Sequence, residues 1–243
     1  MTAIVAHRGL HRHLRENTLE AFEAARAVGA DGVEFDVRRT VNGELVVHHD
    51  PRVGSLVIAE HAASELASYV PSLAAALEAT AGLLVNVEVK NLQERDEPTY
   101  DHSGDFARSV IAAVAASASR SEIIYSSFDL ATCVVLAESS RPVGWLLDVT
   151  DDPRTSLERA ARAGLAGVNP YVGLVDADLV TRAHALGLAV NVWTVNAPTD
   201  LAAMFALGVD VVITDDPETA IAVRDQSAAA NESRRTGDGG KTS

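Results

Sequence analysis

The segment ARAVGADGVEFDV, residues 25–37, joins the end of a helix-like run to an apolar strand-like run through a glycine. Similar junctions are ARAGLAGVNP (161–170), AHALGLAVNVWTV (183–195) and MFALGVDVVITD (204–215). Glycine at such a junction accepts the left-handed backbone conformation that ends a helix. One helix–glycine–strand unit therefore recurs along the chain, which is typical of parallel β/α proteins.

Outside these junctions, strand-like and helix-like runs continue to alternate. The expected strands are residues 3–7, 32–38, 45–48, 83–89, 122–127, 143–149, 167–169, 189–194 and 209–214. The expected helices are residues 18–28, 72–81, 106–117, 130–138, 156–163, 177–186, 200–207 and 218–225. This order predicts an α/β fold, a (β/α)8 TIM-type barrel, although the expected strands exceed by one the eight that such a barrel needs.

The irregular part of the pattern is residues 32–50, where RTVNGE joins two strand-like runs without a helix. The Asn-Gly pair favours an antiparallel hairpin, whereas a short extended crossover would keep the strands parallel. We expect a slightly irregular barrel with no helix between the second and third strands. Residues 226–243 show no periodicity and are predicted to be a disordered tail.

The charge and cysteine content exclude several classes of protein. A formal net charge of −14 argues against nucleic acid as a partner and against stable binding to an anionic membrane. The single cysteine, Cys133, allows neither a disulfide within the chain nor a thiolate metal cluster. No secretion-signal or membrane-spanning pattern is visible, so we expect a cytoplasmic protein. Nothing in the pattern predicts an oligomeric state.

Acidic residues alternate with apolar residues on two of the expected strands. Glu34 and Asp36 share one face of VEFDV, and Glu88 shares a face of VNVEVK with Asn86 and Lys90. An exposed, solvated sheet face would explain the alternation, but parallel sheets are normally covered on both faces. Buried carboxylates are costly unless they are neutralised. We therefore expect Glu34, Asp36 and Glu88 to bind a divalent cation, Mg²⁺ or Ca²⁺.

Two histidines lie where barrel active sites form. His7 ends the first expected strand, and His49 follows the third. Histidine titrates near neutral pH, which suits a general acid and a general base. We expect both to be catalytic, without assigning acid and base between them.

Four further residues are candidates for substrate binding. Arg8 and Lys90 suit a phosphate group, although either could instead pair with the nearby carboxylates. Asn17 could serve the site or cap the helix expected from residue 18. Trp193, at a strand end, could belong to the core or form an apolar wall for the substrate.

Seven stretches of the sequence, taken in chain order, resemble the glycerophosphodiester phosphodiesterase family. They are AHRG, ENTLEAF, VEFDVRRTVNGELVVHHDP, VNVEVK, SSFD, VNVWTVN and GVDVVITDDP. The resemblance covers residues 4–217. It implies a barrel domain over residues 1–225 that hydrolyses glycerophosphodiesters, small-molecule substrates, to glycerol 3-phosphate and an alcohol. By matching blocks it implies catalytic roles for His7 and His49, and a divalent cation on the three acids. It also implies phosphate contacts from Arg8 and Lys90, with Trp193 near the glycerol.

Other functions could use the same scaffold. A lysophospholipase D or a phospholipase-like lyase would need an apolar approach to the pocket. A metal-dependent aldolase or an enolase-type barrel would need Lys90 as a base or as a Schiff-base former, and would leave both histidines without a role. Within the favoured function, the attacking group could be water or a neighbouring hydroxyl of the substrate.

Overall fold

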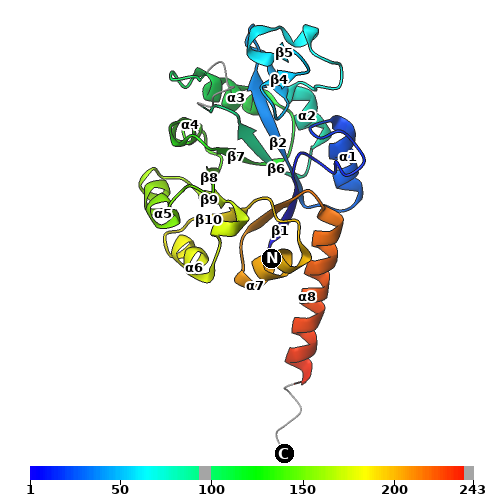
Figure 1. The fold of residues 1–243 in the computed structure, drawn as a ribbon, viewed down its shortest axis with the longest axis vertical. Coiled ribbons are helices and arrows are strands. Elements are labelled where there is room, and N and C mark those ends of the chain that lie inside the picture. Colours follow the sequence, from blue (N-terminus) through cyan, green and yellow to red (C-terminus); the bar gives the residue numbers. More distant parts are fainter. Residues whose placement is uncertain (93–99, 238–243) are drawn as a thin grey trace, which may run out of the picture.

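The computed structural model of the chain describes residues 1–92 and 100–237, and the side chains as far as residue 227. In these residues eight parallel strands close into a barrel, because the first strand pairs with the second and with the last (Figure 1). The barrel strands are β1 (Ala3–Ala6), β2 (Gly32–Arg39), β6 (Leu84–Val89), β7 (Glu122–Ser127), β8 (Val143–Leu147), β9 (Gly167–Pro170), β10 (Ala189–Val192) and β11 (Val211–Thr214). The predicted TIM-type barrel is confirmed.

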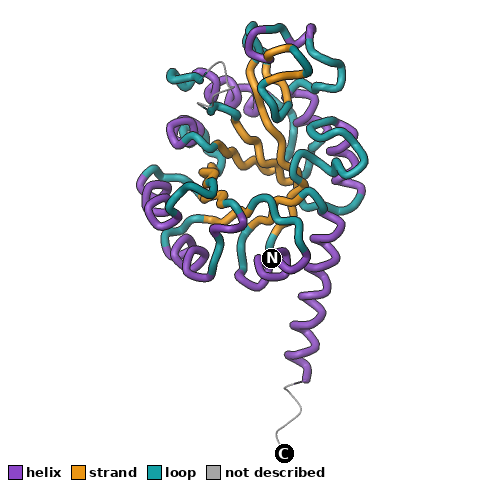
Figure 2. The backbone as a smooth tube through the Cα atoms, in the orientation of Figure 1, coloured by secondary structure: helices purple, strands orange, loops and turns teal. Residues whose placement is uncertain are grey.

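Helices surround the ring of strands (Figure 2). They are α1 (Leu19–Ala27), α2 (Leu73–Ala79), α3 (Asp105–Ala116), α4 (Leu130–Leu136), α5 (Pro153–Arg162), α6 (Ala177–Ala185), α7 (Pro198–Leu207) and α8 (Pro217–Gly237). The glycines of the four repeated junctions all adopt positive φ, between 72° and 85°. They end their helices in the way that the sequence predicts. Among the described residues, no helix has the length and apolar character needed to span a bilayer.

The irregularity after β2 is a hairpin. Strand β3 (Leu45–Val47) pairs with β2 in the antiparallel direction, so it is an appendage of the barrel and not one of its parallel strands. No helix separates β2 from β3, as expected, but α2 lies on the crossover from β2 to the next barrel strand, β6. A second small hairpin, β4 (Arg52–Val53) and β5 (Leu56–Val57), follows β3 at the same end of the molecule. Of the two options left open by the sequence, the antiparallel one is observed.

Strand alternation separates the apolar core from the polar residues. In β2, Val33, Phe35 and Val37 are fully buried in the main hydrophobic cluster, which also contains helix residues such as Phe22. Their neighbours Glu34 and Asp36 face the opposite side of the strand. The register of β2 against β6 then places Asp36 directly beside Glu88. Burial of one face against the helices thus directs the acids of both strands toward the barrel axis.

The C-terminal region differs from its prediction. Helix α8 continues to Gly237 and projects from the barrel, whereas the sequence predicts a disordered tail from Gln226 (Figure 1). The stretch after residue 225 lacks an apolar period, but residues 226–237 include three alanines, two arginines, one glutamine and one glutamate, which have high helix propensity. The end of the predicted tail, residues 238–243, lies outside the described residues.

Candidate active site

A cavity of about 200 Å³ opens at the carboxyl ends of the barrel strands. Its lining includes seven of the nine residues proposed from the sequence, namely His7, Arg8, Glu34, His49, Glu88, Lys90 and Trp193. The other two, Asn17 and Asp36, bind each other beside it, with Asn17 Nδ2 donating to Asp36 Oδ2 at 2.8 Å. Residues that are far apart in the sequence therefore meet at the end of the barrel where active sites form.

The three acids form a compact buried group. Glu34, Asp36 and Glu88 are buried, and each offers a carboxylate oxygen within 4.8 Å of the other two. Glu34 Oε1 is buried without a hydrogen-bond partner among the described residues. Burial, followed by the charges of Asp36 and Glu88, raises the pKa of Glu34 well above its usual value. An incompletely neutralised set of hard oxygen donors fits Mg²⁺ or Ca²⁺.

Two cations offset part of this negative charge. Arg8 Nη1 donates to both carboxylate oxygens of Glu16 at 3.0 Å, and Arg8 Nε lies 3.4 Å from Asp36. Lys90 Nζ donates to Glu88 at 2.8 Å and lies 3.5 Å from Asp36. Burial opposes charge on Asp36, but Lys90 and Arg8 outweigh it and lower the pKa of Asp36. Burial also opposes charge on Lys90, but Glu88 and Asp36 raise its pKa. Arg8 and Lys90 thus make the ion pairs that the sequence left as an option, while lining the cavity.

Arg8 and Asn17 hold an unusual backbone conformation. Both have φ of 56°, in the left-handed region that non-glycine residues seldom adopt, and they are the only such residues in the described chain. In Arg8 this conformation brings the backbone N within 3.0 Å of Glu34 Oε2. In Asn17 it lets the side-chain Nδ2 donate to Asp36 Oδ2. Asn17 is not the cap of α1, because the Thr18 side chain accepts from Ala21 N. Such strain concentrates at functional sites.

Each candidate catalytic histidine has an acidic partner on the same ring nitrogen. His7 Nδ1 lies 2.6 Å from Asp215 Oδ1, and His49 Nδ1 lies 2.8 Å from Asp50 Oδ1. A carboxylate at Nδ1 favours a proton there, so the neutral ring presents an unprotonated Nε2. Burial lowers the pKa of His49, although Asp36 opposes the shift. Arg38 also donates from Nε to the His49 carbonyl at 2.8 Å, which fixes the backbone of this histidine.

Sequence reasoning missed the residues behind His7. Asp215 accepts from Asn196 Nδ2 at 2.7 Å, and His11 Nε2 lies 3.2 Å from Asp215 Oδ1. Burial opposes charge on Asp215, but the hydrogen bonds with His11 and His7 lower its pKa. Asp215 follows β11 directly, so the strand-end argument applied to His7 could have found it. His11 and Asn196 lie in loops and carry no comparable signal.

Trp193 forms an aromatic wall of the cavity. Its ring meets Phe128 edge-on at a centroid distance of 5.3 Å, and Tyr171 at 5.7 Å. Its Nε1 donates to the Asn169 carbonyl at 2.7 Å, which fixes the orientation of the ring. The tryptophan is therefore partly core and partly cavity surface.

The comparison with known families agrees with this geometry. Residues 7–219 match the glycerophosphoryl diester phosphodiesterase family. The chain belongs to this family. Its members include a glycerophosphodiester phosphodiesterase of Bacillus altitudinis, which is 28% identical over 93% of this chain and 99% of its own length. The chain is accordingly a phosphoric diester hydrolase that acts on glycerophosphodiesters.

Solved structures support the same family. A putative glycerophosphoryl diester phosphodiesterase of Agrobacterium tumefaciens has a TM-score of 0.84 at 25% identity, covering 94% of this chain and 99% of its own. An Oleispira antarctica phosphodiesterase in complex with its product sn-glycerol-3-phosphate has a TM-score of 0.81 at 21% identity, covering 93% of this chain and 97% of its own. The latter likeness concerns the fold.

Proposed function

We propose that the protein hydrolyses glycerophosphodiesters to glycerol 3-phosphate and an alcohol in a reaction that depends on a divalent cation and on His7 and His49. The observation that supports it most is the pairing of the two histidines. Both line one cavity with the acidic cluster, and each has its Nδ1 beside a carboxylate. An unprotonated Nε2 on one ring can accept a proton, and the Nε2 of the other ring can donate one when that ring is protonated at both nitrogens.

Glu34, Asp36 and Glu88 would hold the cation, Mg²⁺ or Ca²⁺. When bound, the cation supplies positive charge against the phosphate oxygens. Arg8 and Lys90 add hydrogen-bond donors that would orient the phosphate, since both line the cavity. Trp193 would pack against the glycerol carbons. One histidine removes a proton from the attacking oxygen, and the other protonates the oxygen of the leaving alcohol.

Substitution of the histidines tests the proposal. We expect His7→Asn and His49→Asn each to lower kcat by at least about 10²-fold, the usual contribution of general acid–base catalysis. His184→Asn is the matched control, because His184 is exposed and pairs with Asp210 on the protein surface. Release of glycerol 3-phosphate, coupled to its dehydrogenase, gives the readout. Turnover of either active-site variant at the wild-type rate would refute the paired-histidine mechanism.

A further inference from the structure

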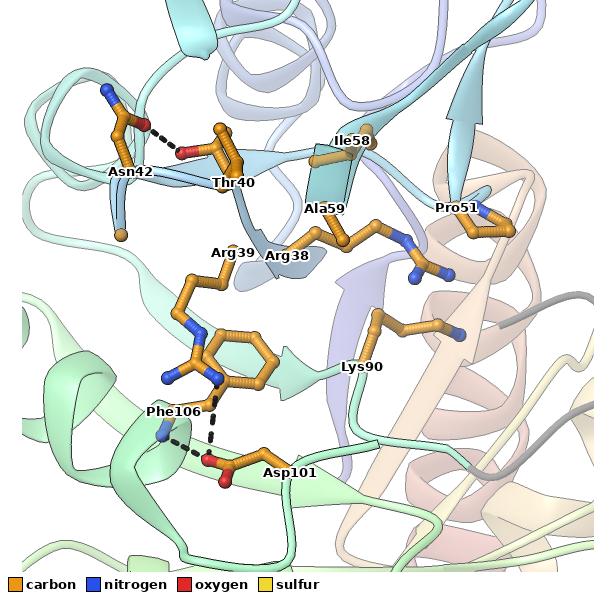
Figure 3. A pocket seen from close by; sticks show the side chains of 12 residues that line it. Arg38, Arg39, Thr40, Asn42, Pro51, Ile58, Ala59, Lys90, Asp101 and Phe106 are labelled. Carbon is orange, nitrogen blue, oxygen red and sulfur yellow. Dashed lines mark hydrogen bonds and ion pairs between the residues drawn. The ribbon is translucent and has the colours of Figure 1, made fainter. Parts of the chain in front are cut away.

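A second cavity, of about 470 Å³, adjoins the active-site cavity. Its lining comes from the β2–β3 hairpin, from the segment around Ile58 and from the start of α3 (Figure 3). Lys90 lines both cavities, so its side chain lies between them. Pro51, two residues after His49, lines the second cavity as well.

The active-site cavity is small for a complete diester. Its volume of about 200 Å³ falls below the roughly 300–1,000 Å³ of most small-molecule sites. The glycerol phosphate half must reach the acids and both histidines. The alcohol half must therefore extend beyond this space, and the adjoining cavity offers room next to Lys90, which contacts the acidic cluster.

The described lining of the second cavity contains three cationic side chains, Arg38, Arg39 and Lys90, and one acid, Asp101. Lys90 is also paired with Glu88 and Asp36 of the active site. Figure 3 shows Arg38 and Lys90 extending in the same direction, while Arg39 turns toward Phe106 and Asp101. The guanidinium of Arg39 lies 5.2 Å from the centre of the Phe106 ring, and its Nη2 lies 3.7 Å from Asp101 Oδ2. These groups are mainly hydrogen-bond donors, which suit hydroxyl oxygens.

The same arrangement disfavours a quaternary ammonium group. Such groups are recognised by open aromatic faces. Phe106 is the aromatic residue of the described lining, and the Arg39 guanidinium already lies near its ring. A choline headgroup would therefore find no free aromatic ring in this lining.

We propose that this cavity binds the leaving alcohol and favours hydroxyl-rich alcohols, such as a cyclitol or glycerol, over choline. The inference rests on the proposed function and specifies its substrate class. Arg39 is the specificity-determining residue that can be tested separately, because Arg38 fixes His49 and Lys90 belongs to the active site. The Arg39 side chain is about one-third exposed (34%), which leaves part of it accessible to a ligand.

The test compares kcat/KM for glycerophosphoinositol and glycerophosphocholine in the wild-type protein and in Arg39→Gln. We expect the wild type to favour the inositol diester and Arg39→Gln to lower the inositol-to-choline ratio about fivefold, the value of one ordinary hydrogen bond. The ratio within each variant is independent of the fraction of folded enzyme. Arg154→Gln, at an exposed ion pair with Asp178, is the control and should leave the ratio unchanged.

Three results would overturn the inference. They are a wild-type preference for the choline diester, an unchanged ratio in Arg39→Gln, and an equal fall in Arg154→Gln. Cleavage of neither diester by the wild type would instead refute the proposed function, and this inference with it. The ratio of kcat/KM for the two diesters thus tests the substrate preference, whereas cleavage of either diester tests the proposed function.

Discussion

Asp215 and Asp216 are adjacent carboxylates with different contacts. Asp215 Oδ1 lies 2.6 Å from His7 Nδ1, whereas Asp216 accepts from the Thr219 backbone and side chain at the start of α8. Asp215 therefore acts as a positioning residue for His7, and Asp216 stabilises the helix start. The two side chains provide a matched pair for mutation.

We expect Asp215→Asn to lower kcat about 10–100-fold, the usual effect of removing the partner that orients a functional histidine. KM should change little, because Asp215 does not line the cavity. Asp216→Asn retains a side chain that can cap α8 and should keep the wild-type kcat. Equal kcat values in the two variants would contradict the positioning role of Asp215.

The pH dependence of activity reports on His49. Burial lowers the pKa of His49 below its ordinary value, while its hydrogen bond with Asp50 raises it. If neutral His49 is required, the acid limb of kcat/KM lies below about pH 6.5, the ordinary histidine value. Asp36 also raises the pKa of His49, but Asp50→Asn removes the contribution of Asp50, so the acid limb should move to still lower pH. An acid limb of kcat/KM that moved to higher pH in Asp50→Asn, or that stayed at the wild-type pH, would contradict this account.

The raised pKa of Glu34 has a consequence for stability. A carboxyl whose pKa is higher in the folded state destabilises the fold as pH rises above the ordinary glutamate value of about 4.3. At pH 8 without divalent cations, Glu34→Gln should therefore have a higher Tm than the wild type, by about 2–4 °C for each kcal/mol relieved. Added Ca²⁺ should raise the wild-type Tm and have much less effect on the variant. A lower Tm for Glu34→Gln in EDTA would contradict the unfavourable burial of the Glu34 carboxylate.

At the scale of elements, the pairing of β2 with β6 sets the spacing of the acids. Gly32 pairs with Leu84 at the start of this ladder, and a Cβ at residue 32 would lie 2.3 Å from the Leu84 carbonyl oxygen. Since that oxygen belongs to the backbone, relief requires the two strands to move apart. Gly29 offers a contrast: space is open around it, but its φ is +85°.

Gly32→Ala should reduce the free energy of unfolding by about 1–3 kcal/mol or more and should also lower kcat. Gly29→Ala should reduce it by about 1–2 kcal/mol, the cost of a left-handed alanine, with kcat unchanged. Urea unfolding and steady-state kinetics measure the two quantities. A Gly32→Ala enzyme with wild-type kcat would show that the acids do not depend on this strand spacing.

The elements differ in how far the sequence predicts them. The helix–glycine–strand junctions were readable because glycine and apolar periodicity act locally. The direction of β3 relative to β2 could not be predicted, because Asn-Gly favours an antiparallel hairpin while the surrounding pattern favours parallel strands. The extent of α8 was missed because its last turns depend on helix propensity and not on an amphipathic face.

At the scale of the whole molecule, barrel closure brings together residues that no local pattern relates. His7 and Asp215 are 208 positions apart and meet because β1 pairs with β11. The alternation of polar and apolar residues along the strands predicted that the acids share a face. It could not predict the hydrogen bond from Arg38 to the His49 carbonyl, because that contact depends on the geometry of the hairpin. The family resemblance and the strand-end argument selected the same site residues. Their catalytic roles remain predictions.

The molecule is acidic, with a net charge of −14, and the site shares this excess of negative charge. Arg8 and Lys90 lie among three buried acids, so the site holds more negative than positive charge before a cation is added. An anionic diester would be repelled by such a site. Cation dependence is therefore the central claim of the account, since without it the acids would oppose substrate binding.

The most direct test is the rate of glycerol 3-phosphate release from glycerophosphoinositol by EDTA-treated protein, before and after addition of Mg²⁺ or Ca²⁺. We predict that the rate falls at least about 10²-fold in EDTA and that one of these cations restores it, but not in Glu88→Gln. Full activity of the EDTA-treated protein, with its metal content shown to be negligible, would contradict the account.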